Sequence, residues 1–343
     1  MTDKPWLAHY DKGVPQTIDI PQAPLFHFLD ESARKYPDRA CTIFKGAVIT
    51  YKEMNELSDR IAAALANMGV KKGDRVGIFM PNTPQFVMAY FGILKAGGVV
   101  VATNPLYTPH EIEHQANDAG IEVMFVMTNF YNTIKKAQPN TKIKKVIVTN
   151  LKETLPPVLR VLFTLLREKK GGFHIDKNLP DGDVWMQDLL GNYKSAARPN
   201  AQVGPDDTAL FQYSGGTTGV SKGAVALHRN IVANTLQIRS WMTVLEEGKE
   251  IVLMGIPLFH VYGMVVGMIA AVQMAAQIVV VPNPRDLPSV VDAIDTYKPT
   301  LFPGAPRMYN GINNYPDIGK HNLRSIRACI KKKKKILLDI KQK

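Results

Sequence analysis

The sequence predicts an α/β protein made of two layered α/β subdomains. Short, continuous apolar stretches alternate with longer amphipathic ones, in one block before about residue 150 and a second after about residue 205. Continuous apolar strands separated by helices are typical of parallel sheets covered on both faces. A chain of 343 residues is also long for one compact core, which favours two packed units. We expect subdomains at 1–200 and 201–330 and a lysine-rich tail at 331–343.

The first block begins with a short strand at Ile49 that becomes a helix, and the start of this helix is marked by a capping box. Thr50 stands three residues before Glu53, so that each side chain can bond to the backbone of the other. A later helix has Pro109 in its first turn and Gly120 at its end, as expected for proline and glycine at these positions. Strands are expected at 75–80, 99–102 and 123–127, and helices at 51–65, 85–96 and 109–119.

The second block resumes after Asp206 with a strand that runs into a glycine-rich segment. The same alternation of apolar strand and helix then continues to about residue 302. Strands are expected at 209–213, 251–256, 278–281 and 300–302, and helices at 228–241, 264–274 and 287–297.

The segment 151–200 is less regular, and it contains a very apolar stretch at 156–167. Two interpretations are open. The stretch is either a helix packed on the protein's own core, or an interfacial helix whose basic neighbours meet lipid head groups. Those basic neighbours are Arg160, Arg167, Lys169 and Lys170.

The net charge of +12 invites a nucleic-acid-binding interpretation. However, residues 331–343 hold seven lysines and one aspartate, which is half of the excess. The rest of the chain is mildly basic, so we expect no specific nucleic-acid partner. Anionic substrates or an anionic membrane surface suit this charge equally well.

Several features favour a cytoplasmic protein, with peripheral contact at the inner face of the membrane as an option. No apolar stretch is long enough for a transmembrane helix, and Met1 to Asp11 does not resemble a secretory signal. Only Cys41 and Cys329 are present, so a disulfide framework is not expected.

The segment 213–224 has the composition of a phosphate-binding loop. Its glycines allow positive φ and bring backbone N–H groups close to an anion, while its hydroxyls and Lys222 add donors and positive charge. It lacks the GxxxxGK[ST] spacing of a P-loop, and a plain link between strand and helix is the alternative. The predicted nucleotide-binding residues are Tyr213, Ser214, Gly215, Gly216, Thr217, Thr218, Gly219, Val220, Ser221, Lys222, Gly223 and Ala224.

This segment resembles the signature loop of the adenylate-forming (AMP-binding) superfamily. With Gln212 before it, the Gly-Gly-Thr-Thr-Gly form is most similar to bacterial long-chain fatty-acid–CoA ligases. The segment 256–263, Ile-Pro-Leu-Phe-His-Val-Tyr-Gly, resembles a second family marker, and 301–308 resembles the border of the acyl tunnel. The resemblance implies catalytic roles for Lys222 and His260, and an acyl pocket formed by Phe259, His260, Met264, Gly304 and Ala305.

The resemblance also implies a reaction and its partners. In this family, a carboxylate attacks the α-phosphate of ATP, pyrophosphate leaves, and the thiol of CoA then displaces AMP from the acyl-adenylate. The implied partners are a fatty acid, ATP and CoA, with Mg²⁺ bound by Ser214 or Thr217, and an oligomer is left open. His110 and His114 imitate a zinc pair, but no third ligand is evident, so we do not expect zinc.

The resemblance is expected to end at about residue 330, where five consecutive lysines, 331–335, replace a small-residue turn of the family. We interpret the chain as truncated there, without the family's C-terminal domain, and expect it to form little or no acyl-CoA as printed. The alternatives are a non-catalytic acyl- or nucleotide-binding protein and an adenylate-forming ligase for another carboxylic acid.

Overall fold

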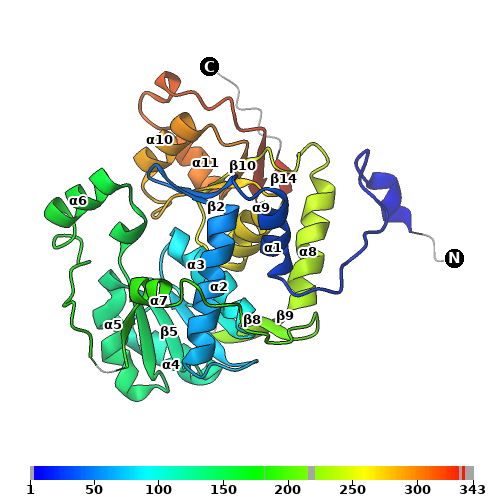
Figure 1. Ribbon diagram of the computed structural model, residues 1–343. Helices are drawn as coiled ribbons and strands as arrows, with labels where there is room; N and C mark the ends of the chain where they lie inside the picture. The colour runs from blue at the N-terminus through cyan, green and yellow to red at the C-terminus, as the bar shows by residue number, and fades with distance from the viewer. Residues whose placement is uncertain (1–3, 181, 215–220, 332–333, 337–343) are drawn as a thin grey trace.

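The computed structural model describes residues 4–180, 182–214, 221–331 and 334–336, apart from the side chains of Ser214, Lys331 and 334–336. Within these residues, two seven-stranded sheets lie one above the other, with helices between and around them (Figure 1). This arrangement confirms the predicted α/β class with two layered, mainly parallel sheets.

The first sheet has the strand order β7-β6-β5-β3-β4-β8-β9. Its strands are parallel except for β9, which runs antiparallel to β8 at one edge. The strands are β3 (Arg75–Phe79), β4 (Val99–Ala102), β5 (Val123–Met127), β6 (Lys145–Thr149), β7 (Val184–Trp185), β8 (Thr208–Ser214) and β9 (Lys222–Leu227).

The second sheet has the order β14-β13-β12-β10-β11-β1-β2. Its edge strands β2 and β14 are antiparallel to their neighbours, and the inner strands are parallel. The strands are β1 (Ala40–Phe44), β2 (Ala47–Thr50), β10 (Ile251–Met254), β11 (Gln277–Val280), β12 (Leu301–Pro303), β13 (Ala328–Lys331) and β14 (Lys334–Ile336).

The two sheets exchange strands across the boundary that we predict near residue 200. The early strand β1 pairs with β11 of the second sheet, and the late strand β8 pairs with β4 of the first. The sequence pattern shows where strands lie but not which strands are neighbours, because pairing depends on contacts between distant residues.

Helices fill the space between the sheets and cover their outer faces. Every residue of α3 is buried, including the polar Gln85 and Lys95 at its two ends. Its other residues are mostly apolar, as expected for a buried helix, and α2 and α3 lie between the sheets in Figure 1. The helices are α1 (His27–Lys35), α2 (Tyr51–Asn67), α3 (Pro84–Lys95), α4 (Pro109–Ala119), α5 (Tyr131–Ala137), α6 (Pro157–Leu166), α7 (Met186–Asn192), α8 (His228–Trp241), α9 (Ala270–Gln273), α10 (Leu287–Tyr297) and α11 (Pro306–Asn313).

Local signals for helix ends are confirmed. Thr50 and Glu53 form the predicted capping box at the start of α2, and Gly120 ends α4 in the left-handed conformation. The predicted helix 264–274 is different, because a π-helix at Gly263–Ile269 precedes the short helix α9.

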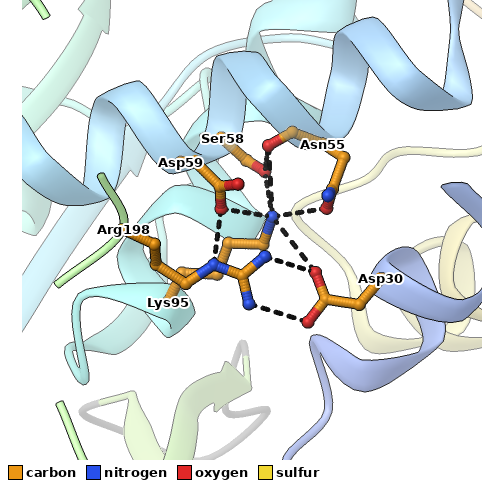
Figure 2. A network of polar contacts seen from close by, with 6 residues as sticks. All are labelled: Asp30, Asn55, Ser58, Asp59, Lys95 and Arg198. Carbon is orange, nitrogen blue, oxygen red and sulfur yellow. Dashed lines mark hydrogen bonds and ion pairs between the residues drawn. The ribbon is translucent and has the colours of Figure 1, made fainter. Parts of the chain in front are cut away.

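A buried lysine joins three helices (Figure 2). The fully buried Nζ atom of Lys95, at the end of α3, donates to Asn55 Oδ1 at 2.6 Å, Ser58 Oγ at 2.7 Å and Asp59 Oδ1 at 2.8 Å, all on α2. It also lies 3.5 Å from Asp30 Oδ1 on α1. Burial lowers the pKa of Lys95, and the carboxylates of Asp59 and Asp30 oppose that shift.

Arg198 completes this network from the segment that leads to β8. Its guanidinium donates to Asp59 Oδ1 at 2.6 Å and to Asp30 Oδ2 at 2.8 Å. Two cations and two carboxylates therefore hold α1, α2, α3 and the segment before β8 together, with charges that balance.

The helix α6 forms where the apolar stretch predicts it, but it is not packed on the core. None of its ten residues, all of which the structure describes, is buried, so the interpretation as a core helix is wrong. None of the helices in the described part of the chain combines the length and apolar character needed to span a bilayer.

Candidate functional site

The predicted phosphate-binding segment connects two antiparallel strands, β8 and the edge strand β9. Tyr213 pairs with Gly223 and Ser214 with Lys222 where β8 and β9 meet. Strand β9 is missing from the sequence-based prediction, although the apolar run 224–227 is a signal for it. The residues between the strands, Gly215, Gly216, Thr217, Thr218, Gly219 and Val220, and the side chain of Ser214 lie outside the described part of the chain.

Tyr213 packs against β9 and is hydrogen-bonded to α4. Its ring is buried against the backbone of Gly223, where a Cβ atom would lie 2.9 Å from the ring. Its hydroxyl donates to Asp118 Oδ2 on α4 at 2.5 Å. Burial, together with the hydrogen bond to Asp118, raises the pKa of this hydroxyl, so it stays protonated as a donor.

Helix α4 contacts both ends of the predicted loop. One turn before Asp118, the Nε2 atom of His114 lies 3.2 Å from the carbonyl oxygen of Ser221. Side chains four residues apart share one face of a helix, so His114 and Asp118 hold the two strand ends of the hairpin. In the sequence, His114 is notable only because its spacing from His110 resembles that of two zinc ligands. The described residues contain no group of three metal-binding side chains.

The hydrogen bond between Tyr213 and Asp118 can be tested by a double-mutant cycle. Tyr213→Phe and Asp118→Ala are each expected to lower the free energy of unfolding by about 1 kcal/mol. The double variant is expected to lose little more, because both changes remove the same bond. Urea denaturation measures all three values, and fully additive losses would contradict the contact.

The segment that carries His260 is held by a buried asparagine. Asn82 Oδ1 accepts from the backbone N–H of Leu258 at 2.8 Å, and its Nδ2 donates to the carbonyl of Ile256 at 2.8 Å. Asn82 follows β3 between two prolines. The sequence-based site prediction does not include Asn82, although a buried asparagine needs partners of this kind.

Gln212 links the hairpin to the His260 segment. Its Nε2 donates to the carbonyl oxygen of Phe259 at 3.3 Å, so two predicted motifs that are distant in sequence are neighbours in space. The Oε1 atom of Gln212 is buried and has no hydrogen-bond partner among the described residues. A buried acceptor of this kind normally has a hydrogen-bond partner in a folded protein.

His260 is exposed at the start of the turn into the π-helix. Its Nδ1 accepts from the backbone N–H of Tyr262 at 3.2 Å, and its carbonyl accepts from Met264 at 2.9 Å. Gly263 has no space for a side chain, since its Cβ would lie 2.1 Å from the carbonyl oxygen of Pro257. Phe259 is half-buried, and Met264 is buried in the core.

The predicted acyl-pocket residues Gly304 and Ala305 follow β12. The carbonyl oxygen of Ile330 accepts from the N–H of Gly304 at 3.0 Å and from the Tyr309 hydroxyl at 3.0 Å. The Tyr262 hydroxyl bonds to the same oxygen, which connects this region to the His260 segment. Gly304 is buried against the Tyr309 ring and Ala305 is exposed, while Tyr262 and Tyr309 are absent from the sequence-based prediction.

These elements follow the carboxyl ends of strands, two in each sheet, and the hydrogen bonds of Asn82, Gln212 and Tyr262 connect them. Asn82 comes after β3, the hairpin turn after β8, the His260 segment after β10 and Gly304 after β12. Ligands of α/β proteins bind outside the carboxyl ends of parallel strands. Two surface hollows lie instead near the amino ends of β3 and β4, around Arg75 and Val99, and contain none of the candidate residues.

Among the described residues of the predicted loop, Lys222 is the one that carries a positive charge. Lys222 is exposed on the edge strand β9, next to the hairpin turn, where its ammonium is able to meet a phosphate. Ser214 and Thr217, the two candidate ligands of Mg²⁺, carry hydroxyl oxygens, and Mg²⁺ prefers oxygen ligands. Both side chains lie outside the described part of the chain.

Comparisons with known proteins show the family to which the chain belongs. A family model described as "AMP-binding enzyme" matches residues 29–336, which extends past residue 330, where the resemblance was expected to end. The chain is 35% identical to a long-chain-fatty-acid–CoA ligase of Bacillus subtilis (strain 168) over 343 residues, which is 100% of this chain and 61% of that protein.

Two solved structures have the same fold. The anthranilate CoA ligase AuaEII, solved in complex with anthranoyl-AMP, has a TM-score of 0.77 at 21% identity over 92% of this chain and 55% of its own. A long-chain-fatty-acid-CoA ligase (FadD1) from Archaeoglobus fulgidus has a TM-score of 0.75 at 22% identity, over 93% of this chain and 59% of its own. The chain therefore spans little more than half the length of these proteins. With a family model over most of its length and a relative at 35% identity, this chain belongs to the AMP-binding enzyme family.

Proposed function

We propose that this chain is the nucleotide- and acyl-binding part of a long-chain fatty-acid–CoA ligase. The observation that carries the proposal is the hydrogen bond from Gln212 to the carbonyl of Phe259. It supports the proposal because β8, which leads into the glycine-rich segment expected to bind phosphates, contacts the His260 segment expected to bind a carboxylate and its acyl chain. An enzyme that joins ATP to a fatty acid needs these two sites next to each other.

The proposed reaction has two displacements. A carboxylate oxygen bonds to the α-phosphorus of ATP while the bond to pyrophosphate breaks, and the CoA sulfur then bonds to the acyl carbon as AMP leaves. We assign Lys222 and the hairpin amides to the phosphate charge, and His260 to the carboxylate. Fixed donors of this kind stabilise the charge that develops in the transition state.

The remaining site residues have supporting roles in this proposal. Phe259, His260, Met264, Gly304 and Ala305 would line the acyl chain, with Asn82 and Tyr262 holding the backbone segments that carry them. Mg²⁺, bound through Ser214 or Thr217, would neutralise phosphate charge when present. CoA is the second substrate.

We propose subdomains at 1–200 and 201–330 that exchange strands, since β1 and β2 lie in the second sheet and β8 and β9 in the first. We propose the tail at 331–343 as a further segment, of which 334–336 form β14 at the edge of the second sheet. Cys41 and Cys329 are buried free thiols, which supports a reducing compartment such as the cytoplasm.

The role of Lys222 is tested by calorimetric titration of the chain with ATP and with a non-hydrolysable acyl-adenylate analogue. Lys222→Ala is expected to weaken ATP binding roughly tenfold, because a charge-assisted bond to phosphate is lost. The matched control Lys12→Ala, an exposed lysine of the N-terminal segment, is expected to change nothing. Equal ATP affinity of both variants would overturn the assigned role.

Turnover is tested with palmitate, ATP and CoA. The chain as printed is expected to form little or no acyl-CoA, whereas the chain extended by the remaining part of the Bacillus subtilis relative is expected to be active. Activity of the extended chain on short or aromatic acids alone would assign the site to another carboxylic acid. Binding without turnover in both forms would assign it to a non-catalytic acyl- or nucleotide-binding protein.

A further inference from the structure

Helix α6 exposes an apolar stripe to solvent. Six of its side chains are between 39% and 75% exposed, and all are valine or leucine. In Figure 1, α6 stands at the left edge of the molecule, apart from the other helices. A contiguous apolar surface of this kind marks an interaction site in a folded protein. The six residues are Val158, Leu159, Val161, Leu162, Leu165 and Leu166.

The outward orientation of α6 is fixed by a polar anchor at its base. The carboxylate of Glu168, two residues after the end of the helix, is buried and accepts from Lys152 Nζ at 2.7 Å and Asn150 Nδ2 at 2.9 Å. Phe163, the helix residue that faces inward, packs edge-on against Phe173 with ring centroids 5.3 Å apart. A buried ion pair and a ring contact hold the helix with its apolar stripe outward.

Positive charge accompanies the apolar stripe. At 100° per residue, Arg160 and Arg167 lie on the face opposite Val158, Leu162 and Leu165, and the exposed Lys169 and Lys170 follow the helix. The nearby acidic side chains already form ion pairs, Glu153 with Arg160 and Glu168 with Lys152. An apolar face combined with a basic polar face is the pattern of helices that lie in a membrane interface.

We propose that α6 docks this protein on the surface of an anionic lipid bilayer. Val158, Leu162 and Leu165 would enter the boundary between head groups and acyl chains, while Lys169 and Lys170, which follow the helix, meet lipid phosphates. The basic flank is what favours lipid over an apolar protein groove, because anionic head groups complement it. The surface is separate from the β8–β9 hairpin, so the proposal does not depend on the proposed function.

The test is co-sedimentation of the chain with phosphatidylcholine vesicles that contain or lack phosphatidylglycerol, without nucleotide. The chain is expected to bind the anionic vesicles. Leu162→Glu/Leu165→Glu and Lys169→Glu/Lys170→Glu are each expected to weaken this binding at least about tenfold. The matched controls Val244→Glu and Lys142→Glu alter an exposed valine and an exposed lysine elsewhere, and they are expected to bind like the parent chain.

The altered side chains are exposed, so circular dichroism and thermal melting of all variants should match the parent. Failure to bind anionic vesicles, or equal binding by the α6 variants and the controls, would overturn the proposal. So would self-association of the parent chain in sedimentation velocity that Leu162→Glu/Leu165→Glu abolishes while vesicle binding is unchanged. That result would assign the stripe to a second copy of the chain.

Discussion

Replacing Lys95 by methionine is expected to lower the free energy of unfolding by about 3 kcal/mol, since removal of one partner from a buried ionic cluster leaves the others uncompensated. The ammonium is fully buried and contacts Asn55, Ser58 and Asp59 at 2.6–2.8 Å. Methionine has a similar volume but no donor. The carboxylates of Asp30 and Asp59 would then depend on Arg198 alone. Urea denaturation followed by circular dichroism measures the loss.

Lys35→Met is the matched control for this prediction. Lys35 pairs with Glu247 at 3.3 Å on the surface, where both side chains are exposed. Exposed ion pairs contribute less than about 1 kcal/mol, so this variant is expected to unfold nearly like the parent chain. If Lys95→Met were equally mild, the network in Figure 2 would not be what holds α1, α2 and α3 together.

Gly263→Ala is expected to lower the free energy of unfolding by about 2–3 kcal/mol, which is the upper end of the range for overpacked substitutions. The new Cβ would lie 2.1 Å from the carbonyl oxygen of Pro257, so the backbone of the His260 segment has to move. In the proposed function this displaces His260 and Phe259 from the acyl site. Affinity for the acyl-adenylate analogue is therefore expected to fall as well.

Gly267→Ala provides a control within the same π-helix. Its Cβ would meet the terminal methyl group of Met254 at 2.5 Å, but a flexible methionine can turn away at small cost. This variant is expected to retain both stability and analogue affinity. Equal effects of the two substitutions would show that the approach of Gly263 to Pro257 has no special importance for the site.

The extent to which the sequence predicts this structure depends on the range of each interaction. The capping box of Thr50 and Glu53 and the glycine end of α4 involve residues within one helical turn, and both are confirmed. The partners that shape the candidate site act over long separations. Asn82 reaches Leu258 across 176 residues, and Asp118 reaches Tyr213 across 95. No local pattern predicts such pairs.

The difference between local and long-range interactions also explains why the sequence predicts neither the exposure of α6 nor the strand β9. Apolar periodicity predicts that residues 156–167 form a helix, but it cannot distinguish a face that meets the core from one that meets solvent. For β9, the short run after Lys222 becomes a strand because β8 offers an open edge to pair with. In both cases the outcome depends on what surrounds the segment, which a single sequence does not contain.

The exchange of strands between the sheets has a consequence for synthesis on the ribosome. Thr42 of β1 is paired with Ile278 of β11, so its neighbour in the sheet is made 236 residues later. At roughly 5–20 residues per second, this delay is on the order of 10–50 s. During that time the β1–β2 hairpin has an unpaired, apolar edge, the kind of surface to which chaperones bind. The nascent chain is therefore exposed to aggregation until most of the second sheet has left the ribosome.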